Sequence, residues 1–439
     1  MLLAIDTHHS PDTEAMNPAA LPPLKVMLLT SSLHYGGAER QVVELAKHLD
    51  RRRFEPLLCC LDGTRTLFDL SPSPTPVLMA KRRLRFDPIP FFQVAWLLRQ
   101  RSIDVLHCFL FDAEIIGRLA GRLTHVPAVI ASERNSDYPP MPVKDRIQRL
   151  TRPCVDLMIA NSHAGKRYAI GHLGFEPARV AVVHNGVDTE RFSPGDQVSA
   201  RDRLGIPADA AVVGMFASFK EQKNHAMYFR AASRILDHRP NTWFLCVSYV
   251  PWYPWSHHTA DEYQASLHRL LARSRLGNRM KILTDRTDVE QLYCACDVTL
   301  LTSRREGTPN VVLESMASGV PVIATDVADN ALILDEGSGG SVVSPDDDAA
   351  MADHVCQLLA DAAALRSASA RARRRAVTRH SLSLWASKIG TLYEQTYCRK
   401  LSQSHIERMG DQVHHSRPNR DRTTLEPTCD NVNASDGTA

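Results

Sequence analysis

The sequence lacks the patterns that mark zinc-ribbon, secreted and membrane-spanning proteins. Its ten cysteines include no CxxC pair, and its histidines show no HExxH spacing, so no metal is expected. No apolar run approaches the roughly 18 residues that a membrane span needs. The N-terminus has neither the basic nor the apolar region of a secretory signal. We therefore predict a reduced, cytoplasmic chain that reaches the inner face of the cell membrane only from the side.

A strong excess of charge is also missing. The formal net charge is only +3 with 23% charged residues, which argues against a general nucleic-acid binder. With 44% hydrophobic residues, 439 residues suffice for two or three domains with separate cores. Basic residues cluster at 81–85 and 371–375. A solvated surface is the simpler interpretation of both clusters, and peripheral contact with an anionic membrane is the alternative.

Short apolar runs alternate with amphipathic segments along the chain. Residues 25–30 are typical of a buried strand, a loop with Gly36 and Gly37 follows, and apolar residues then recur at helical spacing. This order is typical of the first unit of a Rossmann-like domain. Further strands are predicted at 57–61, 105–108, 128–132, 157–160 and 180–183, and helices at 91–99, 113–123, 143–150 and 164–173.

A second series of strands begins after residue 195. Its members are predicted at 212–216, 244–247, 281–283, 298–301 and 322–324. The fold class is therefore α/β, with two Rossmann-like, doubly wound parallel-sheet domains that face each other across a cleft. The predicted parts are a disordered leader at 1–23, domains at 24–194 and 195–380, an amphipathic helix within 381–400, and a disordered tail at 401–439.

Residues 304–321 are the most informative segment. They follow a predicted strand; Pro309 suits the first turn of a helix, and Gly319 suits the end of that helix. Ligands of an open parallel sheet bind at the carboxyl ends of the strands. We therefore expect the free backbone N–H groups of Thr308 and Asn310 to face the cleft, where they suit an anion such as diphosphate.

Two carboxylates flank this helix start. Glu306 lies on the loop and Glu314 lies about a turn and a half into the helix. Carboxylates at these places can accept hydrogen bonds from sugar or ribose hydroxyls. A capped helix with two solvated glutamates is the alternative, but the apolar runs on either side disfavour it.

The stretch E-G-T-P-N-V-V-L-E-S-M-A-S-G-V-P-V-I-A-T around these glutamates resembles the signature of glycosyltransferase family four, the retaining enzymes of GT-B fold. Other segments resemble that family in the same order along the chain. They are the glycine loop at 35–40, D-V-L-H at 104–107, the segments at 159–162 and 183–188, and the lysine loop at 220–225. The resemblance covers residues 25–397 and implies that the helix after residue 384 crosses back onto the first domain.

The resemblance also implies roles for individual residues. Glu314 would hold the ribose hydroxyls, Glu306 the hydroxyls of the transferred sugar, and Lys223 the departing diphosphate. The glycines of the first loop would let the backbone approach the donor closely. Catalytic candidates are Glu306, Lys223, Arg134 and His107; donor-binding candidates are Gly36, Gly37, Lys220, Gly307, Thr308, Pro309, Asn310 and Glu314.

Two positions depart from the family's pattern. Ser218 stands where relatives commonly carry an arginine, and Lys220 is the candidate replacement for that second cation. Arg134 stands after the strand at 128–132, where many relatives place a histidine that touches the sugar. Both departures concern the donor preference and the rate and leave the fold unaffected.

The function that follows is retaining transfer of a hexose-type sugar from a UDP- or GDP-sugar to a saccharide or lipid-linked acceptor, in polysaccharide or glycolipid biosynthesis. The sugar nucleotide is a substrate, and no cofactor or metal is expected. A sugar-nucleotide epimerase of the same fold and a non-catalytic nucleotide-sugar-binding protein are the alternatives. A dinucleotide oxidoreductase is disfavoured because the first loop lacks GxGxxG.

Overall fold

The computed structural model describes residues 22–33, 36–62, 75–80, 87–134, 141–248, 257–284, 286–335 and 339–415. Most of the expected leader, the basic cluster at 81–85 and the end of the expected tail lie outside these residues. The chain divides into a large unit, Met1–Tyr397, and a small one, Cys398–Ala439. The two sheets and the site lie in the large unit.

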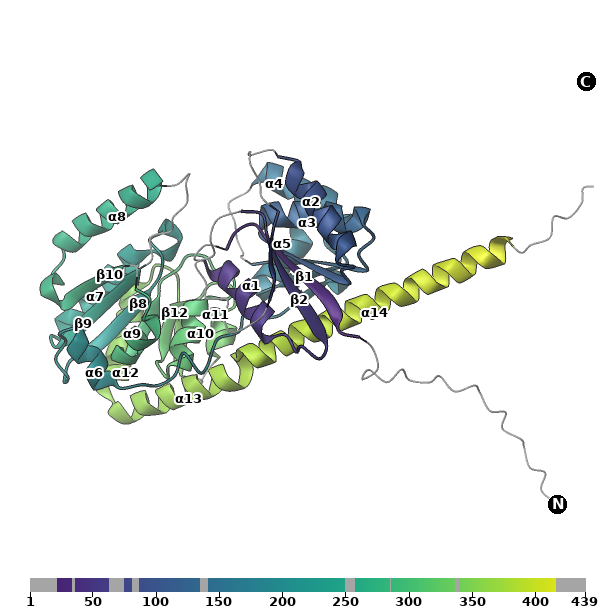
Figure 1. Cartoon of the computed structure of the whole chain (residues 1–439). Helices are drawn as coiled ribbons and strands as arrows, with labels where there is room; N and C mark the ends of the chain where they lie inside the picture. The colour runs from purple at the N-terminus through teal and green to yellow at the C-terminus, as the bar shows by residue number, and fades with distance from the viewer. Residues whose placement is uncertain are drawn as a thin grey trace, which may run out of the picture. The chain divides into compact units, whose positions relative to one another are not determined.

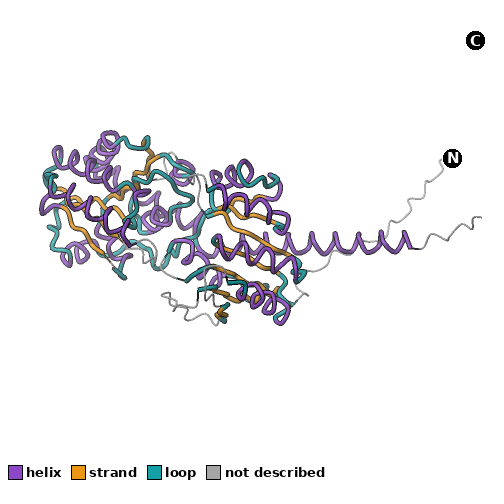
Figure 2. The backbone as a smooth tube through the Cα atoms, turned by 90° about the horizontal axis from the view of Figure 1, so that it is seen from above, coloured by secondary structure: helices purple, strands orange, loops and turns teal. Residues whose placement is uncertain are grey.

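The first sheet is seven-stranded and entirely parallel, in the order β3-β2-β1-β4-β5-β6-β7. Its strands read as continuous apolar runs because helices cover both faces (Figure 2). The strands are β1 (Leu24–Thr30), β2 (Phe54–Cys60), β3 (Val77–Met79), β4 (Val105–Phe109), β5 (Ala128–Glu133), β6 (Leu157–Ala160) and β7 (Val180–Val182). The helices are α1 (Gly37–His48), α2 (Ile89–Gln100), α3 (Phe111–Leu123), α4 (Pro142–Thr151) and α5 (His163–Gly171).

The second sheet has six parallel strands in the order β10-β9-β8-β11-β12-β13. Its strands are β8 (Ala211–Phe216), β9 (Thr242–Ser248), β10 (Met280–Thr284), β11 (Val298–Leu301), β12 (Val322–Thr325) and β13 (Gly340–Val343). Its helices are α6 (Gln197–Arg203), α7 (His225–His238), α8 (His257–Ala272), α9 (Val289–Ala295), α10 (Asn310–Ala317), α11 (Asn330–Leu334), α12 (Asp348–Ala360) and α13 (Ala362–His380). The two parallel sheets confirm the predicted α/β class (Figure 1).

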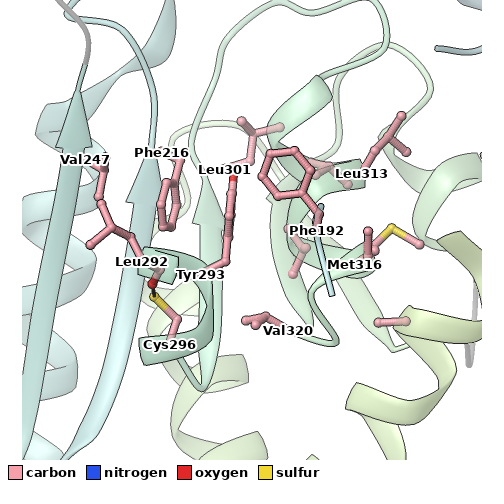
Figure 3. Packing of buried hydrophobic residues seen from close by; sticks show 14 of the residues in the cluster. Phe192, Phe216, Val247, Leu292, Tyr293, Cys296, Leu301, Leu313, Met316 and Val320 are labelled. Atoms are coloured by element: carbon pink, nitrogen blue, oxygen red, sulfur yellow. Dashed lines mark hydrogen bonds between the residues drawn. The ribbon is translucent and has the colours of Figure 1, made fainter. Parts of the chain in front are cut away.

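One core cluster anchors α10 against the second sheet (Figure 3). The rings of Phe216 and Tyr293 stack with centroids 3.8 Å apart, and Leu313 and Met316 of α10 belong to the same cluster. The helix ends at Ala317, close to the end predicted at Gly319, and Gly319 adopts the left-handed conformation with φ +73°. Apolar burial therefore holds α10 in place, and its polar start lies beyond the carboxyl end of β11.

The strand order reverses direction beside the first strand of each sheet. In the first sheet β1 lies between β2 and β4, and in the second β8 lies between β9 and β11. Loops that leave neighbouring strands to opposite faces create a crevice at this switch point. The loops that follow β1, β8 and β11 carry most of the predicted site residues, so the topology directs these to the crevices; His107 lies within β4 and Arg134 follows β5.

The last helix, α14 (Leu382–His415), returns to the first sheet. At its start the Val187 N–H donates to the His380 carbonyl oxygen at 2.7 Å, and the Leu382 N–H donates to the Val187 carbonyl oxygen at 3.1 Å. Trp385, Ile389 and Tyr393 then join the core cluster of β1, β2 and β4. The helix is not confined to the expected range of 381–400 but enters the segment that was predicted as a disordered tail. It continues through His415, because extending an anchored helix adds one hydrogen bond per residue at low cost.

The variant Trp385→Ala tests whether α14 packs against the first sheet. The Trp385 side chain is 2% exposed, and a Cβ placed on Gly186 would lie 2.9 Å from the Trp385 Cβ. Trp385→Ala should lower the free energy of unfolding by about 3–5 kcal/mol, as removal of a buried aromatic side chain does. Chemical denaturation measures it, with the exposed Lys388→Ala as the matched control on the same helix. Equal stabilities of the two variants would contradict the packing.

Candidate functional site

An ion pair joins the loops that follow β8 and β11. Lys223 Nζ lies 2.5 Å from Glu306 Oε1, and Glu306 is only 6% exposed. Lys223 ends a short 3-10 turn, after which Asn224 adopts a left-handed conformation and caps α7 through its side chain. Two predicted site residues that are 83 positions apart are thus in direct contact.

Further hydrogen bonds hold these two loops in register. The Gln222 side-chain amide donates to the Arg305 carbonyl oxygen at 2.6 Å, and the Arg304 N–H donates to the Gln222 carbonyl oxygen at 2.9 Å. The Thr302 hydroxyl donates to the Lys223 carbonyl oxygen at 2.8 Å. The position of the lysine is therefore fixed by backbone contacts as well as by its own charge.

Lys220 belongs to the same electrostatic site. Burial lowers the pKa of its ammonium group, the positive charge of Lys223 lowers it further, and the carboxylates of Glu39 and Glu306 oppose the shift. The Lys220 side chain is therefore not fully solvated. Two lysine charges act on one another at the carboxyl end of β8, three residues apart.

The start of α10 contacts the glycine loop of the first sheet. The helix begins at Asn310, so Pro309 is the residue before it and not part of the first turn as predicted. The Asn310 side chain donates to the Gly37 carbonyl oxygen at 3.2 Å, and a Cβ on Gly37 would lie 3.3 Å from that Asn310 nitrogen. Gly36 directly precedes α1. Gly37 thus allows a close approach of α10, whereas a Cβ on Gly36 would lie 2.1 Å from Glu39 Oε2. The expected approach of both glycines to the donor stays a prediction.

Glycine is required at position 307 by the first domain. A Cβ there would lie 2.4 Å from Asn161 Oδ1 and 2.9 Å from the Arg134 carbonyl oxygen. The neighbouring Thr308 hydroxyl donates to the Asn161 carbonyl oxygen, and the Asn161 side chain donates to that of Arg134 at 3.0 Å. The loop before α10 is therefore enclosed by residues that follow β5 and β6.

Arg134 reaches the same junction through Asn185. Its guanidinium donates to Asn185 Oδ1 at 2.9 Å, and Asn185 Nδ2 in turn donates to Asn310 Oδ1 at 2.7 Å. Burial lowers the pKa of Arg134 to about 10, against the opposing charges of Glu133 and Glu39. Asn161 and Asn185 were not among the predicted site residues, although both lie in segments that resemble the family.

The second carboxylate is paired across the domains. Glu314 Oε1 lies 2.6 Å from an Arg40 guanidinium nitrogen, and Glu314 Oε2 accepts from the Tyr293 hydroxyl at 3.1 Å. Arg40 is on α1, and its guanidinium carbon lies 5.6 Å from the centre of the Phe192 ring. Sequence reasoning missed Arg40; its place in the glycine-loop segment was the only available signal.

His107 is not brought to these groups. Its ring nitrogens lie 2.6 Å from the Tyr393 hydroxyl and 2.8 Å from the Ser132 hydroxyl, and the residue is 1% exposed. Burial lowers its pKa well below the ordinary value, and Arg134 adds to the shift. The structure places this predicted catalytic residue in the core between the first sheet and α14, where it joins two elements.

Two known protein families match the chain. Glycosyltransferase Family 4 matches residues 35–191, and Glycosyl transferases group 1 matches residues 210–361. Together they account for well over half of the chain, one on each sheet. The chain belongs to the group 1 glycosyltransferases of family four.

Curated relatives match parts of the chain at about 26–31% identity. The chain is 31% identical over 206 residues to D-inositol 3-phosphate glycosyltransferase 2 of Catenulispora acidiphila, which covers 46% of this chain and 48% of the relative. It is 26% identical over 254 residues to the UDP-Gal:alpha-D-GlcNAc-diphosphoundecaprenol alpha-1,3-galactosyltransferase of Escherichia coli, which covers 55% and 63%. The matched part thus spans between about half and two thirds of these relatives.

Solved structures show the same fold. Anabaena HepE in complex with UDP superposes with a TM-score of 0.74 at 22% identity, over 85% of this chain and all of that one. A glycosyltransferase from Rickettsia africae gives a TM-score of 0.72 at 18% identity, over 85% and 98%. These matches and the two sheets establish a GT-B fold.

Because His107 is buried and uncharged, it should make the fold sensitive to acid. Below its ordinary pKa of 6.5 the unfolded chain binds a proton there that the folded chain does not, so stability falls as the pH falls. His225 and His380, whose pKa values burial lowers to about 4 and about 3, act in the same direction. His107→Gln should reduce the slope of unfolding free energy against pH by about 1.4 kcal/mol per pH unit, between pH 6 and 5. An unchanged slope would contradict a neutral, buried His107.

Proposed function

We propose that the chain is a retaining hexosyltransferase that uses a UDP- or GDP-sugar and requires no metal. The observation that carries this proposal is the contact of Lys223 with Glu306 beside the start of α10. It places a cation, a carboxylate and a helix N-terminus together at a switch point, where open α/β sheets bind ligands.

Each of these groups has a chemical task in sugar transfer. As the sugar–phosphate bond breaks, negative charge grows on the departing diphosphate. Lys223, with Lys220 nearby, offers preorganised positive charge for it, and the first N–H groups of α10 add the favourable end of the helix dipole. Glu306 orients Lys223 and accepts hydrogen bonds from hydroxyls of the bound sugar.

The ribose of the donor belongs at Glu314. An ionised carboxylate accepts about four hydrogen bonds, and Arg40 and Tyr293 supply two of them here. Ribose hydroxyls therefore have capacity left on the same carboxylate. Because Arg40 belongs to the first domain, it also links occupancy of this site to the approach of the two domains.

The acceptor belongs on the side of the first domain, and we propose a saccharide or lipid-linked acceptor. On α2 the large apolar side chains of Phe92 and Trp96 are 64% and 60% exposed, which suits peripheral contact with a membrane that carries a lipid-linked sugar. The basic residues 81–85, expected to assist, lie outside the described residues. Among the helices that the structure describes, none is long and apolar enough to cross a bilayer.

A panel of labelled sugar nucleotides tests the activity. We expect transfer of one hexose from a UDP- or GDP-sugar, with the donor's anomeric configuration kept in the NMR spectrum of the product. Activity should survive EDTA, because lysines and a helix N-terminus supply the charge that a metal would give. A lipid-linked acceptor in anionic vesicles and a soluble saccharide serve as parallel acceptors. An inverted product, a requirement for magnesium or manganese, or interconversion of the donor sugar without transfer would contradict the proposal.

Substitution of the two lysines separates their contributions. Lys223→Ala should lower kcat by about 10²–10³, as loss of one preorganised charge-stabilising donor does. Lys220→Ala should lower it by a smaller factor, and Ser218→Arg should partly restore Lys220→Ala. The exposed Lys388→Ala is the control for a general loss of charge. Unchanged turnover in Lys220→Ala would show that Lys220 has not replaced the missing arginine.

A further inference from the structure

A second polar cluster, which shares no residue with the proposed donor site, connects the two domains. Asp329 lies between β12 and α11 of the second sheet, His163 is the first residue of α5, and His184 follows β7. Asp329 Oδ2 lies 2.9 Å from His163 Nδ1 and 2.7 Å from His184 Nε2. The carboxylate side chain is 4% exposed, whereas the His163 ring is 52% exposed. The cluster is therefore anchored at the carboxylate and open to solvent at one imidazole.

The backbone of α5 orients this carboxylate. The His163 N–H donates to Asp329 Oδ2 at 2.7 Å, and the Ala164 N–H donates to Oδ1 at 3.4 Å. The next N–H of the helix, that of Gly165, is taken by the Ser162 hydroxyl at 2.9 Å. Such outer hydrogen bonds are what fixes a carboxylate that serves as a metal ligand.

Two of the three distances between the ligand atoms are close to those that a first-row divalent ion requires. Nitrogen and oxygen ligands about 2.0–2.1 Å from zinc are roughly 2.9–3.3 Å apart at angles between 90° and tetrahedral. The observed nitrogen–oxygen distances are 2.9 and 2.7 Å, and all three atoms lie within 4.8 Å of one another. Movement of the imidazole rings, chiefly of the exposed His163 ring, would bring the two nitrogens to an ion beside this carboxylate.

The chemistry of the ligands selects the kind of ion. Two imidazoles with one carboxylate suit zinc and other divalent transition metals, whereas calcium and magnesium prefer oxygen ligands alone. An ionised carboxylate only accepts hydrogen bonds, so in the metal-free contact each imidazole nitrogen carries a proton. A bound ion would take the place of these protons on the same two nitrogens, and in a neutral imidazole the proton then resides on the other ring nitrogen.

We propose that His163, His184 and Asp329 form a binding site for one divalent transition-metal ion, such as Zn²⁺, that bridges the two domains. Water from the open His163 side completes the coordination. The ion would clamp α5 and the segment after β7 to the loop before α11. The site shares no residue with the Lys223–Glu306 pair, and its hydrogen bonds hold the same junction without an ion. Sugar transfer therefore does not require it, and the proposal stands independently of the proposed function.

Titration of the full-length, chelator-treated protein with Zn²⁺ and Co²⁺ tests the site. We expect one Zn²⁺ per chain by calorimetry, visible absorption bands of Co²⁺ bound in a low-symmetry site, and a Tm raised by Zn²⁺ but not by Mg²⁺ or Ca²⁺. His184→Gln keeps an N–H donor for Asp329 and removes the imidazole. It should weaken Zn²⁺ binding at least tenfold, since even second-shell changes cost that much.

His172→Gln is the matched control. This exposed histidine follows α5 and stacks on Tyr168, outside the cluster. Its loss should leave the Zn²⁺ affinity and the Co²⁺ bands unchanged. The proposal is overturned if the wild type binds Zn²⁺ no tighter than His184→Gln does, or if His172→Gln weakens binding equally. Because these experiments contain no sugar nucleotide and no acceptor substrate, neither result depends on whether the protein transfers sugar.

Discussion

Two buried carboxylates that must be paired with cations set the arrangement of the site. Glu306 and Glu314 are each 6% exposed, and an unpaired charge at such a position would be strongly destabilising. Glu306 is paired with Lys223 of its own domain, and Glu314 with Arg40 of the other domain. The loop after β8, the start of α10 and the start of α1 are therefore tied together. In the proposed function, the same charges serve the sugar, the diphosphate and the ribose of the donor.

Polar contacts join the two domains where their loops face each other. The asparagine contacts, from Asn161 to Thr308 and from Asn185 to Asn310, satisfy backbone and side-chain groups at the two facing loop edges. When two domains separate, hydrogen bonds to water replace hydrogen bonds of this kind. Breaking them therefore costs less free energy than exposing an apolar interface would. In contrast, the return of α14 onto the first sheet is apolar, with Trp385 and Tyr393 buried, so that contact is suited to permanence. The contact between the two domains and the return of α14 are thus built from different chemistry.

The sequence was sufficient for the elements whose signal is local. The apolar runs of β1, β6, β8 and β11 and the glycine that ends α10 were all predicted, because full burial and left-handed backbone require those residue types. The short edge strands β3 and β13 were missed. β13 is G-S-V-V, with too few apolar residues to be distinguished from a loop. The extension of α14 to His415 was missed because polar composition alone does not decide between helix and coil.

The site shows the same division between local and distant signals. Glu306, Lys223 and the loop around Gly307 follow strands and could be placed by spacing and resemblance, whereas the Arg40–Glu314 pair joins residues 274 positions apart. His107 illustrates the limit within a single strand. Val105, His107 and Phe109 alternate onto the face of β4 that α14 covers, and only the tertiary fold shows which face that is.

The most direct test of the account is the contribution of the diphosphate to nucleotide affinity. Calorimetry would compare the preferred nucleoside diphosphate, UDP or GDP, with its monophosphate, in the wild type and in Lys223→Ala. We predict that the wild type binds the diphosphate at least tenfold tighter and that Lys223→Ala brings this ratio close to one, with little change for the monophosphate. A Lys223→Ala protein that keeps the full preference for the diphosphate would show that the charge is held elsewhere, and would contradict the site assigned to Lys223 and α10.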